Sequence, residues 1–416
     1  MPTGWRSRRA SPARSTTSAA AWRGASRRCS TPCCRSARRE SRSSRIPSGS
    51  VRATSRCCSG TIPSSYGRPA GSRRSRSSER CATCWSTGAR VDRRPRPAVG
   101  VVRVLITGVG GFVGHHLARH LRAGGLEPLG LEREAFPSAL DGVLGAGYTV
   151  DLRDRDGLAA AVAAARPSAI VHLAAQSSAA RSFEQPVDTF HVNVLGTWNL
   201  LEAVRREVPR ARLLVVGTGE SYGPQPEGTR VAEDAPFRPV SPYAFSKAAA
   251  DLGAEACAQA WGLDVVRVRA FSHTGPGQAT RFAVASFAEQ IAAIEGGRRE
   301  PVLQVGNLEV TRDLLDVRDV VDAYRTLLER GRSGAAYNVC RGEGVRLADV
   351  AQGLIDRARV PVRCEVDQGR FRPADVPYLV GDPTTAAREV DWRARIPLGR
   401  TLDDLLEDWR ERARGE

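Results

Sequence analysis

Residues 101–114 read Val-Val-Arg-Val-Leu-Ile-Thr-Gly-Val-Gly-Gly-Phe-Val-Gly. The first six residues are mostly β-branched and apolar, which is typical of a buried parallel strand. The glycines that follow precede a stretch with helical periodicity, residues 112–122. In a strand–turn–helix setting, Gly108 permits a tight turn, Gly111 lets the backbone approach a pyrophosphate, and Gly114 lets the helix pack close to the strand. The segment therefore predicts a dinucleotide-binding loop.

Outward from this loop, short apolar runs alternate with amphipathic stretches. This alternation predicts right-handed βαβ units and an α/β fold with a doubly wound parallel sheet. After about residue 270 the elements become shorter, which indicates a smaller lobe, and Thr401 is the expected N-cap of a final helix. We expect strands at 128–131, 169–173, 213–216 and 265–268, and helices at 156–164, 190–207 and 243–261. The expected parts are an extension (1–100), a dinucleotide-binding domain (101–270), and a substrate lobe (271–416) with some elements returning to the first domain.

The charge of the chain is concentrated in its first hundred residues. The net charge is +17, but residues 1–100 hold 23 arginines and three acidic residues, so the remainder carries −3. This Arg- and Ser-rich extension has too little apolar surface to fold, which predicts disorder or a mis-called start codon. A transit peptide and non-specific nucleic-acid binding are the alternatives. The charge of residues 101–416 does not favour nucleic acid as their ligand.

The second strand ends in an acidic residue, Glu132, about 20 positions after the glycine loop. An acid at this place binds the adenosine ribose hydroxyls and favours NADH over NADPH. Arg133 leaves NADPH open, because a guanidinium can bind a 2′-phosphate. Asp151 and Leu152, after the third strand, are expected to flank the adenine.

Tyr243 and Lys247 lie four residues apart and therefore on one helix face. A nearby ammonium is expected to lower the pKa of the tyrosine, and Lys247 is the only lysine in a chain that otherwise uses arginine. Thr218, at the end of a buried strand, is placed to hydrogen-bond a substrate oxygen beside Tyr243. Glu220 is a candidate general base or a partner for sugar hydroxyls.

With these motifs together, the sequence resembles the extended short-chain dehydrogenase/reductase (NAD-dependent epimerase/dehydratase) family over residues 103–412. Within it, residues 271–278, 305–308, 312–313 and 372–377 are similar to the GDP-4-keto-6-deoxy-D-mannose reductase branch. The resemblance implies cofactor contacts from the loop, the first helix turn and the end of the fourth strand, namely Gly108, Gly111, Phe112, Val113, Gly114, Leu173, Ala174 and Ala175. It implies substrate contacts from Gln176, Ser177, Ser178, Ser272, His273, Arg312, Arg372 and Asp375, with the two arginines on the diphosphate and Asp375 on the nucleotide ribose.

Two residues depart from the family pattern. Ser272 stands where this branch has asparagine, so a contact to the diphosphate is lost or mediated by water. Gly219 stands where thymidine-diphosphate-type dehydratases have an aspartate, which weakens a dehydratase assignment without excluding the mannose type.

The resulting hypothesis is an NAD(P)H-dependent reductase of GDP-4-keto-6-deoxy-D-mannose, in which Tyr243 protonates the alkoxide that forms at C4. The alternatives are a GDP-mannose 4,6-dehydratase or other nucleotide-sugar epimerase/dehydratase, and a non-catalytic nucleotide-binding protein. The resemblance and the apolar residues of the helices at 190–207 and 243–261 imply a homodimer. Scattered cysteines after residue 100 and the lack of a long apolar run predict a cytoplasmic protein without membrane contact. His115, His116 and His120 lack a third ligand and are expected on a solvent-facing helix side, so no metal site is predicted.

Overall fold

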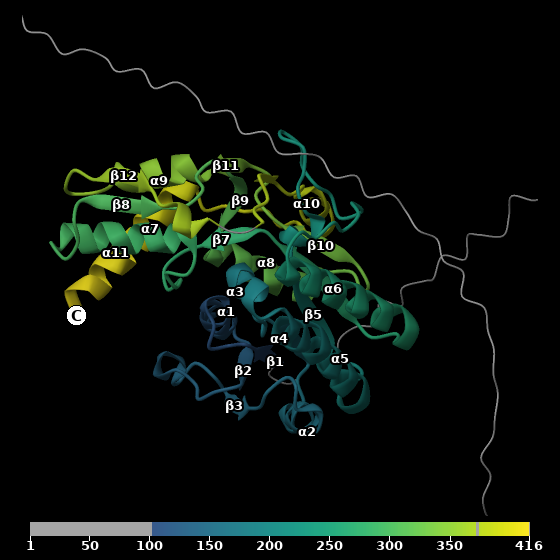
Figure 1. Cartoon of the computed structure of the whole chain (residues 1–416). Coiled ribbons are helices and arrows are strands. Elements are labelled where there is room, and N and C mark those ends of the chain that lie inside the picture. The colour runs from purple at the N-terminus through teal and green to yellow at the C-terminus, as the bar shows by residue number, and fades with distance from the viewer. Residues whose placement is uncertain (1–101, 372–373, 416) are drawn as a thin grey trace, which may run out of the picture. The chain divides into compact units, whose positions relative to one another are not determined.

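A seven-stranded parallel sheet forms the centre of the part of the chain that the computed structural model describes, residues 102–371 and 374–415 (Figure 1). The predictions for residues 1–100 and for Arg372 lie outside this part. Every neighbouring pair in the sheet is parallel, so the predicted doubly wound α/β fold is confirmed. The strand order is β10 (Ala336–Val339), β6 (Val265–Ala270), β5 (Arg212–Thr218), β4 (Ala169–His172), β1 (Arg103–Thr107), β2 (Glu127–Glu132) and β3 (Ala146–Thr149).

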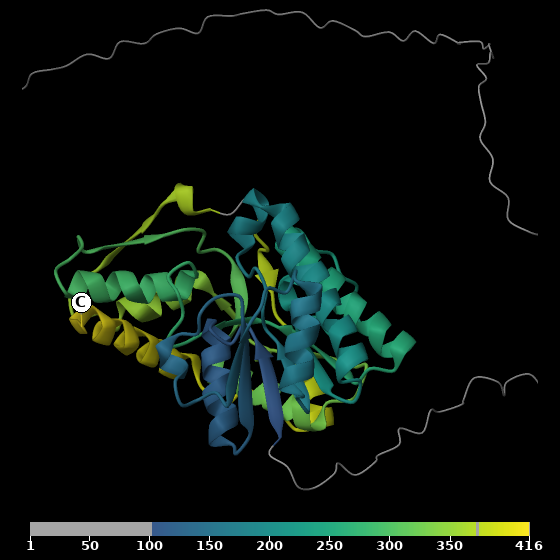
Figure 2. The ribbon, with the colours of Figure 1, turned by 90° about the horizontal axis from the view of Figure 1, so that it is seen from below.

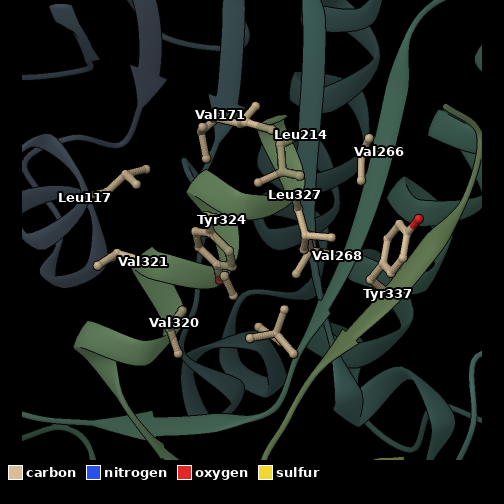
Figure 3. Packing of buried hydrophobic residues seen from close by; sticks show 14 of the residues in the cluster. Leu117, Val171, Leu214, Val266, Val268, Val320, Val321, Tyr324, Leu327 and Tyr337 are labelled. Atoms are coloured by element: carbon tan, nitrogen blue, oxygen red, sulfur yellow. The ribbon is translucent and has the colours of Figure 1, made fainter. Parts of the chain in front are cut away.

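Helices cover both faces of this sheet because the strand side chains alternate between two hydrophobic clusters. Ile106, Val171 and Leu214 belong to the cluster that contains residues of α1 (Phe112–Ala123) and α8 (Val317–Arg330), which Figure 3 shows from close by. The residues preceding them in the strands belong to the second cluster, with α2 (Arg155–Ala165), α5 (Gly196–Glu207) and α6 (Pro242–Trp261). The sheet is therefore buried on both sides, as its apolar runs require.

Most predicted elements lie within two residues of those observed, and two differ. The helix predicted over 190–207 is divided into α4 (Pro186–Phe190), a π-helical turn (His191–Leu195) and α5. The last helix, α11 (Leu398–Gly415), begins before the predicted N-cap. Thr401 lies inside α11, where its hydroxyl donates to the Asp316 carboxylate at 2.8 Å.

The smaller lobe packs α7 (Ala283–Glu295) against α11 and α9 (Leu347–Ile355), and Figure 2 shows α7 and α11 side by side. Its strands form two small sheets. One pairs β8 (Val302–Val305) with β12 (Arg363–Val366), and the other joins β9 (Thr311–Asp316) to β7 (Ser272–Thr274), β11 (Gly344–Arg346) and β13 (Tyr378–Leu379). Three elements beyond residue 270 return to the large sheet and its covering layer, namely β10 in the sheet and α8 and α10 (Thr384–Val390) in the layer. In the described residues, every helix is too short or too polar to cross a membrane.

Candidate functional site

Many of the predicted site residues lie in the segments that follow β1, β4 and β5, at the carboxyl ends of the strands, where open parallel sheets bind their ligands. The order of the strands reverses between β1 and β4, and such a switch point is where open sheets of this kind bind ligands. The glycine loop follows β1, residues 173–178 follow β4, and the short 3₁₀ helix Gly219–Tyr222 follows β5.

The glycine loop has the geometry that its sequence predicts. Gly108 adopts φ +72°, and a Cβ there would lie 2.7 Å from the Ala174 nitrogen. A Cβ on Gly114 would lie 2.5 Å from the Gly108 and Val109 carbonyl oxygens. Gly111 is the N-cap of α1 and has no side chain with which to cap the first N–H groups. The loop is thus shaped for a close anionic group at a helix N-terminus, and it fits a dinucleotide pyrophosphate.

Glu132 turns back onto this loop. Its carboxylate accepts a hydrogen bond from the Gly110 N–H, and burial raises the pKa of the Glu132 carboxyl above its ordinary value. Arg133 points elsewhere, because its exposed guanidinium pairs with Glu134 at 2.6 Å. The acid, rather than the arginine, is therefore the charged group held beside the glycine loop.

Of the two residues predicted to flank the adenine, Asp151 is the more exposed. Its carboxylate pairs with Arg153 at 2.7 Å, and this hydrogen bond lowers the pKa of the Asp151 carboxyl. Leu152 is buried in the hydrophobic cluster beside α5, and its carbonyl accepts from Asn199 at 2.9 Å. Their contact with adenine stays a prediction.

Tyr243 lies in the first turn of α6, which begins there because Ser241 caps the helix and Pro242 occupies its first position. The Tyr243 phenol is hydrogen-bonded to Thr218. Burial, reinforced by the negative charge of Glu220, raises the pKa of Tyr243 above its usual range. The expectation that the pKa of Tyr243 is lowered is therefore wrong for the structure, because burial acts in the opposite direction. This shift favours the neutral phenol.

Lys247 lies one turn further along α6 and is 4% exposed. Burial lowers the pKa of its ammonium from 10.5 to about 8, against the opposing effect of the Asp251 carboxylate. Asp251 itself is buried and paired with two arginines of β6, Arg267 at 2.7 Å and Arg269 at 3.2 Å. The chain thus buries an ammonium on α6, four residues after the tyrosine and therefore on the same helix face.

The segment after β4 is held by hydrogen bonds. The Ala174 N–H donates to the Thr107 hydroxyl at 3.2 Å, and the Gln176 N–H donates to the Asn193 amide oxygen at 2.8 Å. Ser178 caps the short helix α3 (Ala179–Glu184), while Ser177 is exposed. Leu173 and Ala175 are half-buried in this segment, as its place at the sheet edge requires.

A small cavity brings together residues predicted to act on or bind the sugar nucleotide. Arg312, on β9, pairs with Asp375 at 2.8 Å and also donates to the Val376 carbonyl. The cavity is lined by Glu220, Arg312 and Asp375, with Ala179, Val240, Ser241, Ala244, Ala374 and Val376. Residues far apart in the sequence therefore face one space beside α6. Arg372, their predicted companion, lies outside the described residues.

Ser272 and His273 lie on β7, and His273 contacts Phe112, which follows the glycine loop at the start of α1. The His273 ring stacks on Phe112 at 6.2 Å between centroids, and burial lowers the pKa of its imidazole. Ser272 is exposed. Phe112 is also in edge contact with His116, whose Nε2 lies 2.8 Å from the Pro276 carbonyl oxygen.

This contact corrects the expectation for the α1 histidines. His115, His116 and His120 are all half-buried rather than on a solvent face, and burial lowers the pKa of each. Residues 275–278 pack against α1 and cover His116. The sequence around His116 gives no indication of this contact, because its partner lies about 160 residues away. Within the described range, no three His, Cys, Asp or Glu side chains form a metal-binding group.

Sequence reasoning missed a set of polar side chains buried under the site. His172, at the end of β4, is 1% exposed and bonded to Thr107 and Thr197. Asn193 and Ser246 bond to each other at 2.9 Å. The sequence does contain one indication of this set, because His172 ends an otherwise apolar strand. A buried polar side chain at such a place needs hydrogen-bond partners inside the protein.

Comparison with known proteins finds similarity to enzymes named for GDP-linked sugars. The profile of the family described as GDP-mannose 4,6 dehydratase matches residues 105–405. The GDP-6-deoxy-D-mannose reductase of Pseudomonas aeruginosa is 35% identical over 319 residues, covering 76% of this chain and 99% of that protein. The GDP-mannose 4,6-dehydratase of Vibrio cholerae is 29% identical over 350 residues, covering 73% and 92%.

Solved structures of nicotinamide-dependent enzymes superimpose on this fold. RMD from Pseudomonas aeruginosa, complexed with NADPH, superimposes with a TM-score of 0.67 at 32% identity, covering 75% of this chain and 100% of that one. The UDP-glucose 4-epimerase of Thermus thermophilus, in complex with NAD, gives 0.67 at 34% identity, covering 74% and 99%.

Proposed function

The chain belongs to the GDP-mannose 4,6-dehydratase family, and we propose that it reduces the C4 ketone of a GDP-linked 4-keto-6-deoxyhexose. It is an NAD(P)-dependent sugar-nucleotide enzyme of the extended short-chain dehydrogenase/reductase type. The product is GDP-rhamnose or GDP-6-deoxytalose, according to the face of the ketone that is reduced. The name of the Pseudomonas aeruginosa relative, which this chain covers almost end to end, supports a reductase.

The observation that carries this proposal is the contact of Tyr243 with Thr218 at the end of β5, beside Glu220. Reduction of a ketone leaves an alkoxide that needs one proton, so the enzyme requires a proton donor at that oxygen. Burial and the Glu220 charge raise the pKa of the Tyr243 phenol, which favours the protonated form, and Tyr243 is hydrogen-bonded to Thr218. Tyr243 is then the donor, and Thr218 binds the same oxygen. A first step that oxidises the C4 hydroxyl would need Tyr243 as a base instead.

The residues at the strand ends fit a nicotinamide dinucleotide. Gly108, Gly111 and Gly114 would receive the pyrophosphate, Glu132 the adenosine ribose, and Lys247 the nicotinamide ribose. A bound, reduced nicotinamide supplies the two electrons and the hydrogen that the ketone carbon gains. NADH is the proposed preference, because the Glu132 carboxylate repels a 2′-phosphate.

Arg312 and Asp375 are proposed to bind the nucleotide diphosphate and ribose. A guanidinium donates in a fixed fork that matches diphosphate oxygens. Arg312 lines the same cavity as Glu220, which supports a diphosphate site beside the proposed reaction centre. Gln176, Ser177, Ser178, Ser272 and His273 are proposed to complete the sugar-nucleotide site, with Arg372.

A GDP-mannose 4,6-dehydratase is the second candidate, and Glu220 favours it. Its carboxylate lines the cavity and acts electrostatically on Tyr243, where a base for removing a sugar proton would be needed. A dehydratase regenerates its cofactor, whereas a reductase consumes it, so the two reactions differ in stoichiometry.

The test is to incubate the protein with GDP-mannose and NAD(P)H, with and without a separate GDP-mannose 4,6-dehydratase, and to follow absorbance of the reduced cofactor. The proposal requires consumption only when the dehydratase supplies the keto sugar, with one cofactor oxidised per sugar reduced. Keto-sugar formation by this protein alone, without net cofactor use, makes it the dehydratase.

A homodimer is proposed through the exposed apolar side chains of α4, the π-helical turn, α5 and α6, which we call the aromatic face. Phe190 stacks on Phe245 at 6.2 Å, and Trp198 meets Trp261 edge-on at 5.7 Å. Large apolar patches of this kind mark protein interfaces. The face comprises Val187, Phe190, Leu195, Trp198, Phe245, Leu252 and Trp261.

A further inference from the structure

A chain of buried polar side chains runs beneath the glycine loop to the helix that carries Tyr243. It starts at the end of β1, crosses the end of β4, and passes through α5 and the π-helical turn to α6. Each of its five members is at most 2% exposed, so each must find its hydrogen-bond partners inside the protein. In order, they are Thr107, His172, Thr197, Asn193 and Ser246.

The hydrogen bonds of this chain have a defined direction. The Thr197 hydroxyl donates to the Asn193 carbonyl at 2.6 Å, which uses its only hydrogen. His172 Nε2, 2.9 Å from the same oxygen, must therefore be the protonated nitrogen and donate to it. A neutral imidazole then leaves Nδ1 as an acceptor, and the Thr107 hydroxyl donates to it across 2.8 Å.

His172 is also held neutral. Burial lowers the pKa of its imidazole to about 3, and the positive charge of Lys247 adds to this. A protonated ring would present two donors, and the bond with Thr107 would have to reverse. Both ring nitrogens are thus committed to fixed partners, so the residue keeps one tautomer and does not relay protons.

The far end of the chain reaches the candidate reaction centre. Asn193 lies in the π-helical turn, a feature that recurs at functional sites. Its side chain accepts from the Gln176 N–H at 2.8 Å and donates to the Gln176 carbonyl at 3.0 Å and to Ser246 at 2.9 Å. The Ser246 hydroxyl donates to the Tyr243 carbonyl at 2.7 Å.

We propose that His172 is a positioning residue for the reaction, acting through its Nε2–H tautomer. By donating to Thr197, it holds the π-helical turn in the one arrangement that lets Asn193 bind both residue 176 and α6. The phenol of Tyr243 is thereby placed relative to the segment after β4. The activity part of this inference rests on the proposed function, whereas the tautomer does not.

The tautomer is tested directly by ¹⁵N NMR of the full-length protein labelled at its six histidines, with His172→Gln used to assign the signal. The expected spectrum has a protonated Nε2 and an unprotonated Nδ1, unchanged between pH 6 and pH 9. A protonated Nδ1, or a signal that titrates in this range, overturns the inference. This measurement needs no turnover, so it remains decisive if the proposed reaction is incorrect.

Two variants separate positioning from stability. The amide nitrogen of His172→Gln reaches about as far as Nε2 and can donate to Thr197, whereas His172→Asn offers an acceptor near Nδ1 and cannot reach that far. We expect His172→Gln to retain kcat within about threefold and His172→Asn to lose at least tenfold, with KM and the Kd for NAD(P)H changed less than twofold in both. Equal losses of kcat in the two variants, or losses that follow their melting temperatures, overturn a positioning role. If reductase activity is absent in the wild type, keto-sugar formation from GDP-mannose provides the same comparison, since Tyr243 serves both reactions.

Discussion

Replacing Lys247 by methionine should stabilise the protein while abolishing its activity. Lys247 is 4% exposed, and its pKa falls from 10.5 to about 8 on folding, so the protein holds an ammonium in a place that disfavours its charge. At about 1.4 kcal/mol per pH unit, this depression corresponds to about 3 kcal/mol of lost stability near pH 7. Methionine has a similar length and good helix propensity, and it carries no charge.

The substitution leaves no new unpaired charge. Asp251, the carboxylate that acts on Lys247, stays paired with Arg267 and Arg269 at 2.7 and 3.2 Å. The full gain is therefore expected to reach the free energy of unfolding, up to about 3 kcal/mol near pH 7.

The gain must also depend on pH. Between pH 8 and 10.5 the unfolded chain still binds a proton at residue 247 and the folded wild type does not, so wild-type stability rises with pH over this window. The advantage of Lys247→Met should therefore shrink towards zero by pH 10.5. Lys247→Arg is the matched control, because arginine stays charged throughout and lacks this rise.

Urea denaturation followed by tryptophan fluorescence, at pH 7 and at pH 10, measures these differences. NAD(P)H oxidation with the keto sugar measures the activity, which should fall below detection in Lys247→Met. A variant that is less stable than the wild type at pH 7 would refute the reasoning, as would an advantage of equal size at both pH values.

Four further perturbations follow from the site and its surroundings. Tyr243→Phe should lower kcat by about 10²–10⁴-fold with little change in the Kd for NAD(P)H, since only the proton donor is removed; an active variant contradicts the proposed role. Glu132→Gln should raise kcat/KM for NADPH relative to NADH, and an unchanged ratio shows that Glu132 does not set the preference. Trp198→Glu, in the aromatic face, should give a monomer by light scattering, whereas a monomeric wild type would rule out the proposed dimer. Deleting residues 1–98 should preserve kcat/KM and the melting temperature and weaken non-specific DNA binding, because about twenty positive charges are removed; a large loss of kcat/KM would show that the extension contributes to the site.

The features that were predictable from sequence are those encoded by neighbouring residues. The glycine loop and α1 follow from a strand, three glycines and a helical repeat within about twenty positions, and α6 follows from Ser241, Pro242 and the spacing of Tyr243 and Lys247. Such local signals specify backbone conformation without reference to the rest of the fold.

The features that were missed depend on contacts between distant segments. The break in the helix at residues 191–195 accompanies the bonds of Asn193 to Gln176 and Ser246, and helical periodicity continues through it. The pKa of Tyr243 was expected to fall because Lys247 follows it by four residues in the sequence. The burial that raises this pKa depends instead on the folded surroundings of Tyr243. Likewise, only the packing of residues 275–278 on α1 removes His116 from solvent.

The position of β10 has a consequence for synthesis of the protein. Residues 271–335 separate β6 from the strand that pairs with it, so β6 forms the edge of the large sheet until the ribosome has added the intervening lobe. An unpaired, apolar edge is a template for aggregation, and charged side chains on the strand are a common protection. β6 carries two such charges, Arg267 and Arg269. Both form ion pairs with Asp251 of α6, which is synthesised before β6. The residues of these ion pairs are therefore all present before β10 is made, so the edge strand carries two charged side chains during that interval.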